Sequence, residues 1–377
     1  MHLEQKVWTA EGGWKSLKGE NCGDAQLVIF FGGQGVLNDG ARFEDIKAAY
    51  PDAQIIGCST GGEILNEDVL DGSVVSAALR FDKTRIQSTV EAVQSAEDSF
   101  AAGKKIAESL NADDLGNVFI ISDGMNVNGS DLIRGLYDVL DDKVIVTGGL
   151  AGDAADFGTT YVGLNAVPTP KKIAAIGFYG DALKVGYGSV GGWDPFGPER
   201  VVTRSEGNVL FELDGKPALD LYKEYLGDEA EKLPGSALFF PLIVFPEGRK
   251  DNSLVRTIVG IDEAAKSMIF AGDIPRGYMA QLMQGEFGSL ADGAGEAAAL
   301  SLDACGDGDR LAILVSCIGR KLLMGHSIAD ETEAVAEVLD YAPTIGFYSY
   351  GEICHQQFTK ECALHNQTMT VTLFHES

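Results

Sequence analysis

The sequence predicts an α/β protein of two domains, each with a mixed β-sheet covered by helices. A unit of strand, loop, helix, strand and then a glycine followed by a carboxylate occurs three times. The three units open with apolar runs at residues 27–31, 118–121 and 311–315. Reuse of one supersecondary unit places loops of similar chemistry on one side of a molecule. A chain of 377 residues is also longer than one core of ordinary size requires.

The first unit contains two predicted strands, at residues 27–31 and 54–57, with a helix between them that ends before Pro51. Residues 73–81 and 85–93 follow, and both alternate polar and apolar side chains. Because a short turn joins them, we predict that they form a β-hairpin.

The second unit repeats this order from residue 118. We expect Ser130 to cap its helix, and residues 143–146 to form its last strand. Residues 173–179 and 183–190 are then predicted to form a second hairpin around a glycine-aspartate turn.

A cluster of glycine and proline at residues 191–198 indicates the approach to a domain boundary. A short predicted strand at residues 209–213 follows it. We therefore divide the chain into an N-terminal domain, 1–208, and a C-terminal domain, 209–377, which contains the third unit.

The composition excludes several classes of protein. A formal net charge of -27 argues against binding to nucleic acid or to anionic membranes. No apolar stretch approaches the roughly 20 residues of a membrane-spanning helix. Residues 1–17 lack the apolar core of a signal peptide, so we expect a cytoplasmic protein. Its cysteines should then be reduced thiols, namely Cys22, Cys58, Cys305, Cys317, Cys354 and Cys362.

The three glycine-carboxylate motifs form the candidate ligand site. They lie at residues 56–64 (IGCSTGGEI), 146–153 (VTGGLAGD) and 345–353 (IGFYSYGEI). Open backbone N–H groups and the carboxylates would hold an amino-acid-like or other polar ligand. Glycines that merely permit tight turns are the structural alternative. The candidate ligand-binding residues are Ser59, Thr60, Gly62, Glu63, Gly152, Asp153, Arg320, Tyr348, Tyr350, Gly351 and Glu352.

We expect Glu352 to contribute more to ligand binding than Glu63, because Tyr348 and Tyr350 would supply aromatic walls beside it. Loss of its charge in Glu352→Gln should weaken ligand binding about tenfold or more, with little change in stability. Arg320 follows Gly319 and would pair with Glu352 or with an anionic ligand group, and a structural ion pair is the alternative.

Two other chemistries fit parts of the sequence. Residues 57–61 match the Gly-x-Ser-x-Gly nucleophile elbow, which would make Ser59 the nucleophile of an acyl hydrolase. Strand-like sequence follows instead of a helix, so we assign no catalytic residue and expect no enzyme. Zinc-competent side chains, which include Cys354 and His365, also gather near the C-terminus, and His326 follows another predicted strand. Their spacing is not that of a zinc site, so we assign no metal.

Taken together, the motifs at residues 56–64 and 346–353 resemble those of the FIST family, whose members have an N-terminal and a C-terminal FIST domain. Further segments fit the resemblance, at residues 149–153, 197–203, 214–219, 316–320 and 364–370. It implies a cytoplasmic signal-transduction sensor that binds a small ligand and regulates a histidine kinase or a cyclic-di-GMP enzyme. A subgroup of the family is linked to haem and nitric oxide sensing, which makes haem the alternative cofactor, with His326, His365 or Cys354 as its ligand.

Overall fold

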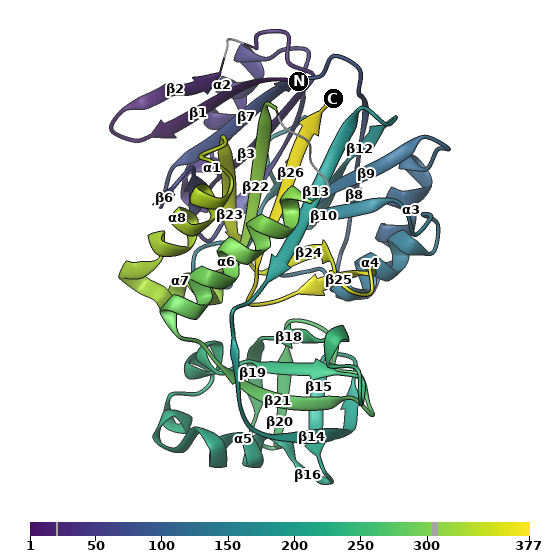
Figure 1. Cartoon of the computed structure of the whole chain (residues 1–377), viewed down its shortest axis with the longest axis vertical. Coiled ribbons are helices and arrows are strands. Elements are labelled where there is room, and N and C mark those ends of the chain that lie inside the picture. Colours follow the sequence, from purple (N-terminus) through teal and green to yellow (C-terminus); the bar gives the residue numbers. More distant parts are fainter. Residues whose placement is uncertain (20–21, 304–307) are drawn as a thin grey trace.

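The computed structural model describes residues 1–19, 22–303 and 308–377, so Cys305 lies outside the described residues. The fold is mixed α/β, as the sequence predicts. In the described part of the chain, three six-stranded sheets form the upper body of Figure 1, and another sheet forms a smaller unit below it. No described helix is both long enough and apolar enough to cross a membrane.

The first sheet is built on the first unit. Its central strands β3 and β4 are parallel, and β7 runs antiparallel to β3. Across the sheet the strands are β11 (Val162–Leu164), β4 (Gln54–Thr60), β3 (Leu27–Gly33), β7 (Val74–Arg80), β1 (His2–Thr9) and β2 (Gly13–Gly19). Helices α1 (Gln34–Leu37) and α2 (Ala41–Ala49) follow β3 in the chain. Phe43 and Ile46 of α2 share a buried cluster with Val28 and Phe30 of β3.

The second sheet repeats this arrangement with β9 and β10 as the parallel pair and β12 antiparallel to β9. Its strands in order are β25 (Cys362–His365), β24 (Gly351–His355), β10 (Ile145–Leu150), β9 (Leu115–Ser122), β12 (Lys172–Tyr179) and β8 (Arg85–Ala92). Its helices are η1 (Ala96–Asp98), α3 (Ser99–Leu110) and α4 (Gly129–Tyr137). The side chain of Asn128 caps α4, two residues before the predicted Ser130, and it accepts the backbone N–H of Ser130.

The third sheet has β22 and β23 as its parallel pair and β26 antiparallel to β22. Its strands in order are β13 (Leu183–Val190), β26 (Met369–Glu376), β22 (Arg310–Cys317), β23 (Thr344–Ser349), β5 (Glu63–Leu65) and β6 (Asp68–Leu70). Its helical segments are α6 (Phe287–Leu302), α7 (Ile318–Met324), η5 (Gly325–Ser327) and α8 (Ala329–Val338).

The units exchange strands, so both predicted hairpins are wrong. Strand β7 lies in the first sheet, whereas β8 crosses to the second and pairs with β12. In the same way β12 stays in the second sheet, whereas β13 crosses to the third and pairs with β26. The physical reason is that each crossing strand covers a sheet edge that would otherwise leave its backbone groups unpaired.

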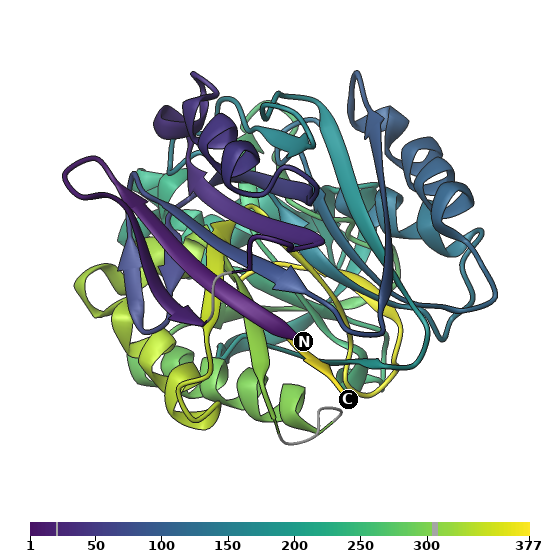
Figure 2. The ribbon, with the colours of Figure 1, turned by 90° about the horizontal axis from the view of Figure 1, so that it is seen from above.

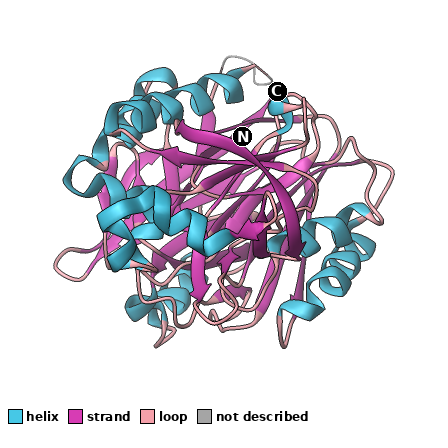
Figure 3. Cartoon of the chain, turned by 90° about the horizontal axis from the view of Figure 1, so that it is seen from below, coloured by secondary structure: helices cyan, strands magenta, loops and turns pink. Residues whose placement is uncertain are grey.

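The largest core cluster lies where the three sheets face one another. Leu27, Ile29 and Phe31 point into it, whereas the intervening Val28 and Phe30 face α2, as the alternation of a strand requires. The rings of Phe31 and Phe347, from the first and third sheets, lie 4.6 Å apart. Figure 3 shows the resulting arrangement, with strands at the centre and helices around the outside.

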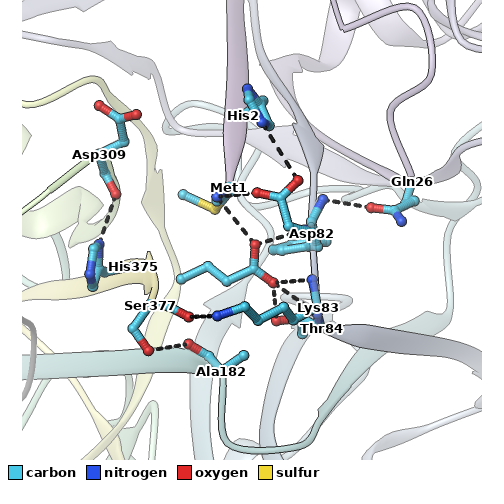
Figure 4. A network of polar contacts seen from close by, with 12 residues as sticks. Met1, His2, Gln26, Asp82, Lys83, Thr84, Ala182, Asp309, His375 and Ser377 are labelled. Atoms are coloured by element: carbon cyan, nitrogen blue, oxygen red, sulfur yellow. Dashed lines mark hydrogen bonds and ion pairs between the residues drawn. The ribbon is translucent and has the colours of Figure 1, made fainter.

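The two chain ends meet beside the turn between β7 and β8 (Figures 2 and 4). The Glu376 carboxylate accepts backbone N–H bonds from Asp82, Lys83 and Thr84 at 2.8 to 3.0 Å. It also lies 3.2 Å from the amino group of Met1. Strand β1 thereby takes the position beside β7 that β8 and β13 take in the other two sheets.

The lower unit is formed by residues 194–284 (Figure 1). Its sheet has the order β18 (Leu254–Arg256), β17 (Leu242–Phe245), β21 (Met279–Gln284), β14 (Asp194–Glu206), β15 (Val209–Leu213), β20 (Ser267–Phe270) and β19 (Ile258–Asp262), with β16 (Lys216–Pro217) beside β15. Its helical segments are α5 (Ala218–Leu226), η2 (Gly227–Lys232), η3 (Gly235–Phe239) and η4 (Lys250–Asn252). The predicted domain boundary at residues 208/209 falls inside this lower unit, between β14 and β15. The division into two domains there stays a prediction.

Candidate functional site

The three glycine-carboxylate motifs meet at one place in the body. The backbone N–H of Gly61 donates to the carbonyl of Tyr348 at 2.7 Å, and that of Gly152 donates to the carbonyl of Ser59 at 3.0 Å. The N–H of Tyr350 donates to the carbonyl of Leu150 at 3.1 Å. Each motif is therefore bonded to both of the others, and the repeat correctly predicts that the loops lie together.

These N–H groups are not open to a ligand, which corrects our expectation. Gly62 donates its N–H to the Thr60 hydroxyl at 3.2 Å, and Ala154 donates to the Thr60 carbonyl at 3.0 Å. The loops approach so closely that a Cβ at Gly152 would lie 2.7 Å from the nitrogen of Gly61. Glycine is needed here because the backbones touch, which is the structural alternative.

Glu63 and Glu352 occupy matching positions and are fully buried. Glu63 accepts from the hydroxyl of Thr60 and from the N–H and hydroxyl of Ser73, the last two at 2.9 and 2.7 Å. Glu352 accepts in the same way from Ser349 at 2.7 Å and from the N–H and hydroxyl of Thr368 at 3.2 and 2.9 Å. Burial raises the pKa of both carboxyls, to about 8 for Glu352. Both carboxylates are thus bonded to the protein itself.

Arg320 does not pair with Glu352. Its fully buried guanidinium lies 2.8 Å from Glu331 and also donates to the carbonyl of Leu290 at 2.8 Å. Glu331 in turn accepts from the hydroxyl of Tyr348 at 2.8 Å. Arg320 and Tyr348 therefore belong to one internal network, as the alternative of a structural ion pair predicts.

Asp153 has a different task from the two glutamates. Its carboxylate accepts the backbone N–H groups of Phe157, Gly158 and Thr159 at 3.0, 2.7 and 2.7 Å, and it also accepts the hydroxyl of Tyr350. The ring of Phe157 stacks on that of Tyr350, with centroids 4.9 Å apart and planes 17° apart. Asp153 thus fixes both a loop and an aromatic pair.

That aromatic pair lines a cleft of about 560 Å³ between the body and the lower unit. On the body side the cleft lies at the carboxyl ends of β9, β10, β22 and β23, where open α/β sheets commonly bind ligands. The body contributes Gly124, Met125, Leu150, Phe157, Ile318 and Tyr350. The lower unit contributes Pro234, Leu238, Thr257, Ile258, Val259 and Ala271.

The loop after β9 is held in place by Asp123, which the sequence did not single out. Its buried carboxylate accepts the N–H groups of Met125 and Asn126 at 2.8 and 2.7 Å, and its other oxygen accepts that of Lys171 at 2.8 Å. This loop carries Met125 into the cleft. An Asp-Gly pair directly after a buried strand was the available signal.

Among the described residues, Tyr350 is the one predicted site residue that lines the cleft. Ser59, Thr60, Gly62, Glu63, Gly152, Asp153, Arg320, Tyr348, Gly351 and Glu352 lie outside its lining. The lower unit supplies residues that we did not predict, above all Thr257. Its hydroxyl has no hydrogen-bond partner, and the residue is only 5% exposed. No repeated motif marks Thr257 in the sequence.

The candidate haem or metal ligands lie elsewhere. Buried His365 contacts the carbonyl of Cys354 through Nε2 at 3.0 Å. Burial lowers the pKa of His365 to about 4 and raises that of Cys354 to about 12. His326 is exposed in η5. Within residues 1–19, 22–303 and 308–377, no three His, Cys, Asp or Glu side chains are grouped to hold a metal ion.

Ser59 is held as a structural residue. Its buried hydroxyl donates to the carbonyl of Gly152 at 2.7 Å and accepts the N–H of Tyr161 at 2.8 Å. Strand β4 leads into β5 rather than into a helix, so the setting of a nucleophile elbow is missing at this turn.

Comparison with known proteins matches residues 26–216 to the FIST N domain and residues 218–355 to the FIST C domain. An uncharacterized protein of Methanocaldococcus jannaschii is 31% identical over 234 residues. The match covers 57% of this chain and 43% of that protein, so the chain spans less than half of the relative's length.

Proposed function

Since the chain belongs to the FIST family, whose domains are associated with sensory and signal-transduction proteins, we propose that it senses a small molecule bound in the cleft beside Tyr350. The observation that carries the proposal is the cleft itself. It is concave, mainly apolar and sited at strand ends, and its volume of about 560 Å³ suits a small ligand.

The position of the cleft suggests how binding becomes a signal. A ligand there would touch Tyr350 of the body and Thr257 of the lower unit together. Direct bonds already join the parts: among them, Gln367 donates to the carbonyl of Leu238 at 3.0 Å, and Arg256 donates to that of Leu364 at 2.9 Å. A ligand that contacts both parts favours the arrangement to which it binds best.

We propose that a partner protein reads this arrangement, such as a histidine kinase or a cyclic-di-GMP enzyme. An amino-acid-like ligand was our expectation from the sequence. The residues of the cleft favour a different ligand class.

The haem-based nitric oxide sensor and the acyl hydrolase fit these residues less well. Haem needs an axial side chain, commonly histidine, and among the described residues no histidine lines the cleft. Hydrolysis needs a nucleophile that a substrate can reach, and Ser59 is fully buried.

The test is to extract the purified protein with organic solvent, identify any copurified small molecule, and add it back in a thermal melt. Ligand at 100 times its Kd should stabilise the protein by about 2.7 kcal/mol. Tyr350→Ala should lose most of this shift, whereas Tyr341→Ala, at a half-exposed tyrosine outside the cleft, should keep it. An undiminished shift in Tyr350→Ala would place the ligand elsewhere.

A further inference from the structure

We infer that the ligand of this cleft is an uncharged, largely apolar molecule with a flat ring and one polar group for the Thr257 hydroxyl. The inference rests on the proposed function, because it names the ligand class of the same cleft. Three features of the lining support it: the absence of charge, the aromatic pair and the unpaired hydroxyl.

The walls of the cleft are neutral. Among the described residues that line it there is no aspartate, glutamate, lysine or arginine. Burial raises the pKa of the Cys317 thiol, so this lining group also stays uncharged at pH 7. The ammonium and carboxylate of an amino acid would lose their water here without gaining opposite charges, which is costly.

The acid that contacts Phe157 and Tyr350 is already occupied. Asp153 lies behind Tyr350 and accepts three backbone N–H groups as well as the tyrosine hydroxyl. It therefore has little capacity left for a ligand ammonium group.

A buried base next to a lining residue in the chain is occupied in the same way. Arg256 precedes Thr257 in the chain, and its guanidinium donates to the carbonyls of Asp273, Leu364 and Val255 at 3.0, 2.9 and 3.2 Å. Arg256 itself is not part of the lining. A ligand carboxylate would therefore meet no free cation in the cleft wall, within the described residues.

Tyr350 offers the ligand its ring and not its hydroxyl. The hydroxyl donates to Asp153 and accepts the N–H of Phe157 at 3.3 Å. Phe157 lies nearly parallel to the ring, and both side chains border the cleft. A flat ring packs well against such an aromatic wall.

Thr257 supplies the polar group that is still unmatched. Buried hydroxyls almost always have a hydrogen-bond partner, because leaving one unpaired costs free energy. The Thr257 hydroxyl has none, and Thr257 is one of the residues that line the cleft. A ligand hydroxyl, carbonyl or ring N–H at this position would complete its hydrogen bonding.

The test compares neutral probes with their charged counterparts by calorimetry on the full chain. The pairs are p-cresol with tyrosine and indole with tryptophan, which share a ring and differ by the amino-acid group. We expect p-cresol and indole to bind saturably and at least tenfold more tightly than the amino acids, which is about 1.4 kcal/mol.

Two pairs of variants locate the binding. Thr257→Val should weaken p-cresol binding about tenfold, whereas Thr372→Val, which removes an unpaired buried hydroxyl outside the cleft, should not. Gly235→Leu should block binding, since a Cβ at this lining position meets no atom within 4 Å and the side chain has room. Gly288→Leu makes the same change at an exposed position with equal room and should bind normally.

Tighter binding of tyrosine or tryptophan would overturn the inference and leave the proposed sensing function standing. Equal affinity of Thr257→Val and the parent for p-cresol would also overturn it, as would a failure of both neutral probes to bind. The proposed function is judged separately, by the copurified molecule and its Tyr350-dependent thermal shift.

Discussion

Glu352 should make the protein less stable as the pH rises. Burial raises the pKa of this carboxyl from 4.5 to about 8, although its hydrogen bonds act in the opposite direction. Between these two pH values the folded protein holds a proton that the unfolded chain releases, so the free energy of unfolding falls with increasing pH. At 1.36 kcal/mol per pH unit, the difference amounts to about 5 kcal/mol between pH 4.5 and 8.

Glu352→Gln isolates this effect. Glutamine keeps the shape of the side chain, its oxygen can accept the N–H of Thr368, and its amide nitrogen can donate to the hydroxyl of Ser349. At pH 5 the variant should match the parent within about 1 kcal/mol, since the parent carboxyl is then protonated. At pH 8.5 it should be several kcal/mol more stable than the parent, on the same pKa difference.

The assay is urea unfolding at pH 5, 6.5 and 8.5 with the m-value followed at each pH. Glu337→Gln, at an exposed glutamate, serves as the matched control and should keep the parent's pH dependence. Burial also raises the pKa of Glu63, so Glu352→Gln should remove only part of the slope. A parent and a Glu352→Gln variant with the same pH dependence would refute the reasoning.

The same variant tests the role we first gave this residue. Glu352 is fully buried and lies outside the cleft lining. Glu352→Gln should therefore bind the copurified molecule as tightly as the parent at pH 5, in place of the tenfold loss expected from the sequence.

Three further predictions concern stability. Arg320→Met should cost about 3 to 5 kcal/mol in urea unfolding because it leaves Glu331 buried and unpaired, and the double replacement with Glu331→Leu should recover much of this. Burial alone would raise the pKa of Glu376, but the hydrogen bonds to its carboxylate outweigh burial and lower the pKa to about 2. Glu376→Gln should therefore be less stable than the parent at pH 7. It should also lose less stability than the parent as the pH falls from 4.5 to 2. Gly148→Ala should fail to yield folded protein by circular dichroism, because its Cβ would lie 1.8 Å from a backbone oxygen at a φ of +143°, whereas Gly35→Ala, with open space, should fold.

Local patterns predicted the parts of this fold whose causes are local. The apolar runs at residues 27–31 and 118–121 identify β3 and β9, because both faces of these strands are buried. The sheet to which a strand belongs is a different matter. Residues 85–92 follow a tight turn after β7 in the manner of a hairpin, and yet their partner is β12, which lies 80 or more positions later in the chain. No local pattern encodes such a pairing.

The repeat of the glycine motifs correctly indicated that their loops lie together, but the interpretation of these loops as a ligand site went too far. Their glycines recur because three loops cross at contact distance, and a Cβ at Gly61 would lie 2.8 Å from Ile318 and 3.1 Å from the carbonyl of Tyr348. A requirement for close backbone approach and a requirement for ligand binding leave the same trace in a sequence. Tyr350 is the residue that connects the motifs with the cleft, since it belongs to the motif at residues 345–353 and also lines the cleft.

The lower unit explains why the cleft forms at only part of this repeated body. Residues 194–284 leave the body after β13 and return through α6, and they face the strand ends of the second and third units. Every body residue in the described cleft lining comes from those two units or the loops that follow them, and none comes from the first. The three units therefore supply a scaffold of similar strand ends, and the segment that covers two of them supplies the unpaired hydroxyl of Thr257. Ligand selectivity should accordingly respond to changes at residues 234–238 and 257–259 far more than to changes at the glycines and carboxylates of the motifs beneath them.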